Sequence, residues 1–132
     1  MRLLRPVLYA QAALWMGFGL LIAVAPRWLL ETVGGQPPLS DDAWARTTGV
    51  TAVILALFMV LVAQRLDEVW WWAWAFALLE IGTGAVFVFH ALLSLPSEAA
   101  AWPWWLLGVA NVAFAGVDLV GLGFTAQEKP FV

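Results

Sequence analysis

The sequence predicts an all-α fold, a membrane four-helix bundle in antiparallel, up-down order with both termini on the cytoplasmic side. Two observations predict this class. Hydrophobic residues make up 64% of the 132 residues and charged residues 11%, whereas soluble domains carry about 25% charged residues. In addition, four apolar runs each approach or exceed the roughly 20 residues that a helix needs to cross a bilayer. The length leaves room for a single domain, residues 1–132.

The predicted helices cover about residues 6–30, 43–63, 69–93 and 102–124. The start of the chain also resembles a signal peptide, because Ala23-Val24-Ala25 has the form of a cleavage site. Pro26 follows directly and disfavours cleavage. We therefore expect the first helix to be retained in the membrane.

Short polar segments separate the predicted helices. Residues 34–38 end the first helical region, since glycine permits positive φ and proline has no amide donor. Ser40, Asp41 and Asp42 then suit a helix start, with a hydroxyl cap and acids at the positive end of the helix dipole. Residues 95–98 separate the third and fourth helices in the same way.

Basic residues and tryptophans predict the orientation and the location. With the N-terminus inside, four basic residues lie on the cytoplasmic side and two outside, as the positive-inside rule favours. The inner group is Arg2, Arg5, Arg65 and Lys129, and the outer group is Arg27 and Arg46. Most tryptophans then fall at a membrane boundary, which indole rings prefer. We expect a multi-pass protein of the bacterial inner membrane, in contact with the lipid bilayer and not with nucleic acid.

Four polar side chains are predicted within the membrane, namely Gln11, Glu80, Asn111 and Asp118. Intramembrane acids usually face protein or water, because an ionised group in hydrocarbon costs at least a few kcal/mol. Counting about 1.5 Å of rise per residue places Glu80 with Asn111 near the midplane, and Gln11 with Asp118 nearer the cytoplasm. We expect contacts within each of these two pairs. For Glu80 three roles stay open: fixing the helix register, meeting a partner subunit, and proton-coupled transport.

Small residues at helical spacing predict the faces through which the helices pack. They are Ala13 and Gly17 in the first helix, Thr48, Ala52 and Ala56 in the second, Ala73, Ala77, Gly84 and Ala91 in the third, and Gly108 and Ala115 in the fourth.

His90 and Arg46 are predicted near the outer boundary. A lone histidine near a helix end usually makes an interfacial hydrogen bond, and the alternative is an axial ligand of a tetrapyrrole. The chain has no cysteine and no second histidine, so no metal site is predicted. Arg46 is expected to pair with Asp41, Asp42 or a lipid phosphate.

The first two helices carry a resemblance to a known group. Pro26 ends the first helix, and an Arg-x-x-Gly pattern, Arg46 to Gly49, opens the second. In these features the chain resembles small bacterial four-helix membrane proteins that are DoxX-like, mostly of unassigned function. The resemblance implies a link to quinone or sulfur redox chemistry in some such families, but the cysteines that would suit that chemistry are absent here.

The sequence contains no arrangement of nucleophile, base and orienting residue and no glycine-rich phosphate loop, so we predict no catalytic residue and no enzyme activity. The expected function is a non-catalytic accessory or structural subunit of a larger inner-membrane complex, packed against other membrane subunits or copies of itself. One alternative is a small oligomeric proton-coupled transporter or channel that uses Glu80. Another is a protein that binds a pigment, lipid or quinone between aromatic side chains. No cofactor is predicted outside that last alternative.

Overall fold

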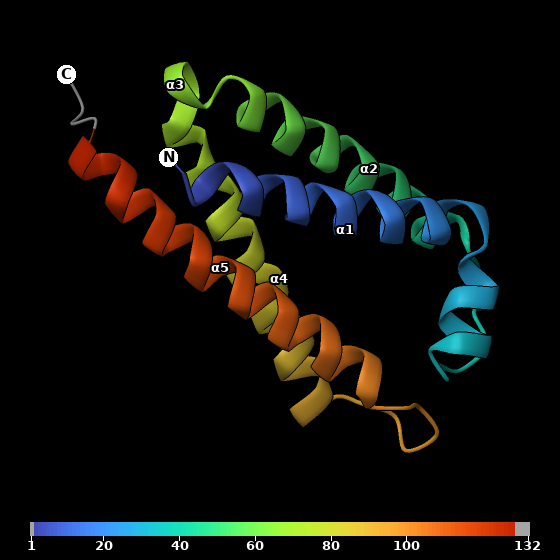
Figure 1. Cartoon of the computed structure of the whole chain (residues 1–132). Helices are drawn as coiled ribbons and strands as arrows, with labels where there is room; N and C mark the ends of the chain where they lie inside the picture. The colour runs from blue at the N-terminus through green and yellow to red at the C-terminus, as the bar shows by residue number, and fades with distance from the viewer. Residues whose placement is uncertain (1, 129–132) are drawn as a thin grey trace.

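The computed structural model describes residues 2–128 and contains helices and no strands in that range (Figure 1). In chain order the elements are α1 (Leu4–Val24), η1 (Trp28–Val33), α2 (Ala43–Gln64), α3 (Leu66–Val69), η2 (Trp70–Trp72), α4 (Ala73–Leu93) and α5 (Trp102–Glu128). The elements α3, η2 and α4 form one continuous helical region, Leu66–Leu93. This region, α1, α2 and α5 are long and apolar enough to cross a membrane, which confirms the predicted all-α class with four membrane-length helices.

The long helices form two antiparallel hairpins, α1 with α2 (hairpin 1) and α4 with α5 (hairpin 2) (Figure 1). Arg5 at the start of α1 donates from Nε to Ala63 O at the end of α2, at 3.1 Å. The hairpins meet where α1 begins and α5 ends, which we call the joined end, and they diverge toward the opposite, splayed end (Figure 1). The helices are therefore paired closely within each hairpin, and the two hairpins pack against each other mainly at the joined end.

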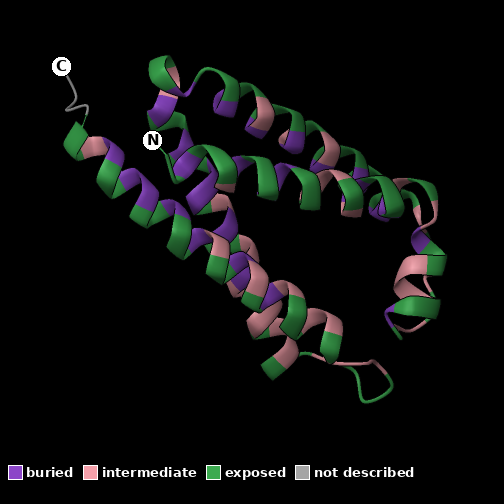
Figure 2. Cartoon of the chain, in the orientation of Figure 1, coloured by how far each residue is buried: buried purple, intermediate pink, exposed green. Residues whose placement is uncertain are grey.

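The apolar core lies at the joined end, where purple buried segments of both hairpins come together (Figure 2). Its largest fully buried members are Leu4, Leu8, Met59, Leu66 and Leu122. The outward faces carry large apolar side chains that are more than half exposed, such as Leu57, Leu78 and Leu106. Helices that are apolar on the outside as well as the inside suit a lipid environment.

Hairpin 1 is held together by a close approach of α1 and α2 at Gly19 and Gly49. A Cβ atom placed on Gly49 would lie 2.5 Å from Ala23 N and 2.6 Å from Gly19 O. Because both neighbours are backbone atoms, only glycine fits at this crossing. The Gly49 of the Arg-x-x-Gly pattern therefore has a packing role.

The first helix is shorter than predicted. It ends at Val24 instead of near residue 30, and a separate wide helical turn, η1, follows. Pro26 accounts for the break, because it lacks the N–H that would continue the backbone ladder. The start of α2 agrees with the prediction, although Asp41 and not Ser40 accepts the early N–H, from Ala43 at 2.9 Å.

The prediction of packed faces was right for hairpin 2 except at Ala91, which is only partly buried, and for α2 except at Thr48, which is exposed. It was wrong for α1. In α4 and α5 the small residues at positions 73, 77, 84, 108 and 115 are buried. In α1, however, Ala13 and Gly17 are exposed, and the buried side chains include Leu8, Gln11 and Ile22. The small residues on the inner face of α1 are Ala12 and Gly19, so this face is rotated away from the predicted positions 13 and 17.

Candidate functional site

The two hairpins are connected by hydrogen bonds between buried polar side chains. Gln11 on α1 donates from Nε2 to Asp118 Oδ2 on α5 at 2.6 Å, and both residues are fully buried. This is the pair that depth counting predicts. Because hydrogen bonds to charged or strongly polar groups favour one geometry, the contact aligns α1 with α5.

The predicted pairing of Glu80 with Asn111 is wrong. Glu80 accepts a hydrogen bond from Trp15 Nε1 on α1 at 2.8 Å, while Asn111 Nδ2 donates to Leu107 O in its own helix at 2.7 Å. Counting residues places side chains at a common depth but does not say which way they point around the helix axis. Trp15 lies away from the membrane boundaries and four residues after Gln11, which puts both donors on the same face of α1.

Gln11, Trp15, Glu80 and Asp118 together form what we call the interhairpin polar cluster. A Cβ placed on Gly84 would lie 3.2 Å from Asn111 Cβ, so these two residues face each other across α4 and α5. Counting along the two antiparallel helices from this contact puts Asp118 at the level of Ala77. Glu80 and Asp118 therefore lie about one helical turn apart along hairpin 2, as do Gln11 and Trp15 along α1. Each donor of α1 thus meets one carboxyl group of hairpin 2.

Several buried oxygen atoms in and near this cluster have no hydrogen-bond partner among the described residues. They are Gln11 Oε1, Asp118 Oδ1 and Asn111 Oδ1. An unsatisfied buried polar atom costs about 1–3 kcal/mol. Two of the three belong to the same pair of side chains, Gln11 and Asp118.

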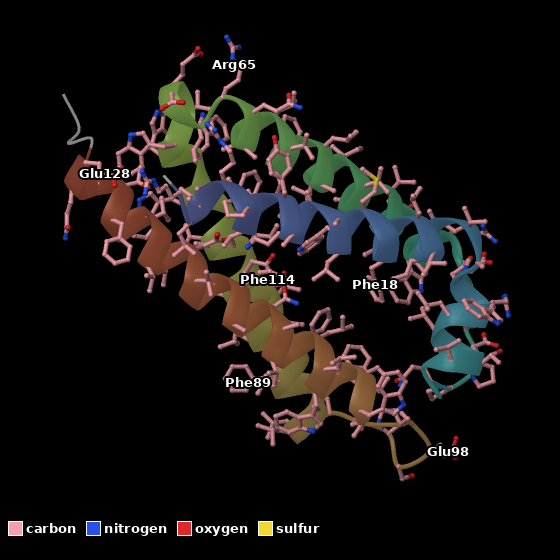
Figure 3. The ribbon with its side chains drawn as sticks, in the orientation of Figure 1. Phe18, Arg65, Phe89, Glu98, Phe114 and Glu128 are labelled. Carbon is pink, nitrogen blue, oxygen red and sulfur yellow. The ribbon has the colours of Figure 1, made fainter. Side chains whose placement is uncertain are left out.

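A cavity of about 310 Å³ lies between the hairpins at the splayed end, and we call it the interhairpin cleft. Its aromatic lining comes from α1, α2, α4 and α5 and consists of Phe18, Trp44, Phe87, Trp102 and Trp104. Phe18 points into the space between the two hairpins, whereas Phe89 on α4 points away from it (Figure 3). The wall is almost entirely apolar, with Thr48 and Gln36 as its polar members.

Hydrogen bonds between two loops close the splayed end beside the cleft. Ala100 N donates to Gly35 O at 2.9 Å, and Gln36 Nε2 donates to Ala100 O at 2.9 Å. Trp104 Nε1 in turn donates to Gln36 Oε1 at 2.9 Å. Gly35 adopts a φ of +61°, which glycine takes without strain. Sequence analysis treated residues 34–38 only as a helix break and missed this contact, which no local signal indicates.

A second apolar groove of about 520 Å³ lies between α2 and α4 near the joined end. Phe58, Leu61, Trp72 and Phe76 line it, and Arg65 lies among its lining residues. The side chain of Arg65 forms an ion pair with Glu68 at 3.2 Å and is largely exposed.

Arg46 lies at the splayed end, where its guanidinium group donates hydrogen bonds to the last carbonyl groups of α1. Its Nη1 donates to Ala23 O at 2.8 Å and to Val24 O at 3.2 Å, and its Nη2 pairs with Asp42 at 3.2 Å. The expected pairing with Asp42 is confirmed. Since the break at Pro26 leaves carbonyl groups of α1 without helical partners, the Arg46–Gly49 pattern joins the second helix to the first.

His90 lies at the splayed end of α4, half-buried, with its ring 4.1 Å from the Trp104 ring. A role as tetrapyrrole ligand stays a prediction. Within residues 2–128 no group of three or more His, Cys, Asp or Glu side chains is placed to hold a metal ion. No protein-family model, curated protein or solved structure matches this chain.

Proposed function

We propose that this chain is a multi-pass protein of the bacterial inner membrane, with both termini cytoplasmic, that binds a lipid-soluble molecule in the interhairpin cleft. The ligand has an apolar chain and a small polar head, as an acyl lipid or a quinone has. The observation that carries this proposal is the apolar cavity of about 310 Å³ with aromatic walls between two diverging hairpins. Small-molecule sites are typically apolar cavities of at least about 300 Å³.

The source of affinity differs from that of a site in a soluble protein. A lipid-soluble molecule leaves an apolar bilayer and not water, so burial itself contributes little. Affinity then depends on shape and on ring contacts, which contribute about 0.5–1.5 kcal/mol for each aromatic pair. Phe18, Phe87 and Trp104 come from three different helices, so their arrangement around a ligand depends on the spacing of the hairpins.

Filling the cleft tests the proposal. Thr48 lines the cleft and Thr47 does not, although both are exposed on α2 and each donates its hydroxyl to the carbonyl group four residues earlier. Thr48→Phe should remove a lipid or quinone that co-purifies in nanodiscs, and Thr47→Phe should retain it. Mass spectrometry of extracted lipids and absorbance of extracted quinones distinguish the two ligand classes. Equal ligand content in both variants would contradict the proposal.

A second candidate is the accessory subunit that the composition predicts. It is favoured by glycines that face outward, since a Cβ on Gly17, Gly82, Gly116 or Gly123 would meet no atom within 4 Å. Glycine destabilises a helix by about 1 kcal/mol relative to alanine, and these positions gain no close packing within the chain. Close approach of another membrane helix would use them.

The accessory role has its own test. Gly116→Leu with Gly123→Leu should dissociate a homo-oligomer or a partner in native mass spectrometry, while Val117→Leu, which is exposed about a quarter turn around the same helix, should not. A monomer without partners in the unmodified protein would exclude this role.

A further inference from the structure

We infer that Asp118 and Gln11 form a proton-binding site between the hairpins. In this site Asp118 carries the proton on Oδ1, and this O–H group donates a hydrogen bond to Gln11 Oε1. This inference is independent of the ligand proposed for the interhairpin cleft. It starts from the two buried oxygen atoms that lack partners, because both belong to side chains already joined by one hydrogen bond.

A single proton satisfies both atoms. The Gln11 amide offers a donor at Nε2 and an acceptor at Oε1, whereas an ionised carboxylate offers acceptors only. With Asp118 ionised, the pair has the one hydrogen bond from Nε2 to Oδ2, and two acceptor oxygens remain unpaired. With Asp118 protonated, the acid and the amide make two hydrogen bonds side by side, each group donating one.

Among the described residues, no side chain donates to Asp118 Oδ1 or to Gln11 Oε1. The elements packed against α5 near this residue are α1, α4 and η2. On α4 the nearby titratable group is Glu80, another acid, which accepts from Trp15. On α1 the charged group toward the joined end is Arg5, whose guanidinium group contacts Ala63 O and Asp67. The described residues of η2 are tryptophans, so this element brings no charged or titratable group to Asp118.

The position of Asp118 also favours the protonated form. Asp118 is fully buried, and Glu80 lies about one helical turn away on the neighbouring helix. Two ionised carboxylates at this separation in an apolar environment would repel each other, so such sites retain a proton. Loss of the proton would remove one of the hydrogen bonds that hold α1 against α5.

Infrared spectroscopy of the purified protein in lipid nanodiscs tests the site, since a protonated carboxyl group has a carbonyl band distinct from that of a carboxylate. At neutral pH the unmodified protein should show this band, and [¹³C]aspartate labelling should shift it. Of the four aspartates, Asp41 and Asp67 are exposed and Asp42 is ion-paired at the splayed end, so a shifted band reports Asp118. No variant is needed for this measurement, which avoids any effect on folding.

Two isosteric variants sharpen the assignment. Asp118→Asn should lose the aspartate-sensitive band, and Glu80→Gln should retain it. Absence of the band at neutral pH would overturn the inference. A band that shifts only with [¹³C]glutamate would overturn it as well, because the proton would then lie on a glutamate such as Glu80. Persistence of the band in Asp118→Asn would overturn it as well.

Discussion

Replacing Gly49 with alanine should separate the two helices of hairpin 1. The added Cβ would lie 2.5 Å from Ala23 N and 2.6 Å from Gly19 O. Since backbone atoms cannot rotate away, α1 and α2 must move apart by about 1 Å to restore ordinary contact distances of about 3.5 Å. This displacement would also lengthen the hydrogen bonds from Arg46 to the end of α1.

The expected loss in the free energy of unfolding follows from the weaker packing between α1 and α2. A gap of about 1 Å removes between a quarter and a half of the attraction of each facing atom pair, and each pair contributes about 0.1–0.2 kcal/mol. For roughly 40 such pairs the loss is about 2 kcal/mol, which lies within the range of about 1–3 kcal/mol for overpacked sites.

Titration with sodium dodecyl sulfate in mixed micelles, followed by tryptophan fluorescence, would measure this difference in the free energy of unfolding. Gly17→Ala is the matched control, because the added methyl group meets no atom within 4 Å on the same helical hairpin. Gly17→Ala should gain up to about 1 kcal/mol from the higher helix propensity of alanine, and the loss at Gly49→Ala is measured relative to this control. If Gly49→Ala were as stable as Gly17→Ala, the close helix crossing would be refuted.

Three further changes test the contacts between elements. Trp15→Phe and Glu80→Leu should show a coupling energy of about 1 kcal/mol in a double-mutant cycle, because each change alone removes the buried hydrogen bond between the two side chains; additive effects would contradict that bond. Arg46→Gln should destabilise the protein by about 1–2 kcal/mol in the same titration, since it loses a charged donor to the end of α1, and an unchanged midpoint would count against the capping role. Spin labels can be placed on cysteines introduced into the two loops of the splayed end, because the chain has no cysteine of its own. Gln36→Leu should broaden the distribution of distances between these labels; an unaltered distribution would show that the loops are held by other contacts.

The apolar length of each segment is enough to predict four membrane-crossing helices, because the backbone in lipid must satisfy its own hydrogen bonds and a helix does so within one segment. Depth counting likewise predicts the Gln11–Asp118 pair, since the rise per residue is the same in every helix. Pro26 marks a break for an equally local reason, the missing N–H. These features depend on one stretch of chain at a time.

The partner of Glu80, the divergence of the hairpins and the interhairpin cleft depend on how separate stretches are placed in three dimensions. Glu80 meets Trp15 and not Asn111 because the rotation of each helix about its own axis, which residue counting leaves undetermined, is set by packing against two neighbours at once. Gln36 contacts Ala100, which is 64 residues away in the loop before α5, and Trp104, which is 68 residues away in α5, so these contacts depend on how the two hairpins are placed. Lipid-facing residues can be read from composition, but the space between two hairpins cannot, because it is defined by side chains from four helices together.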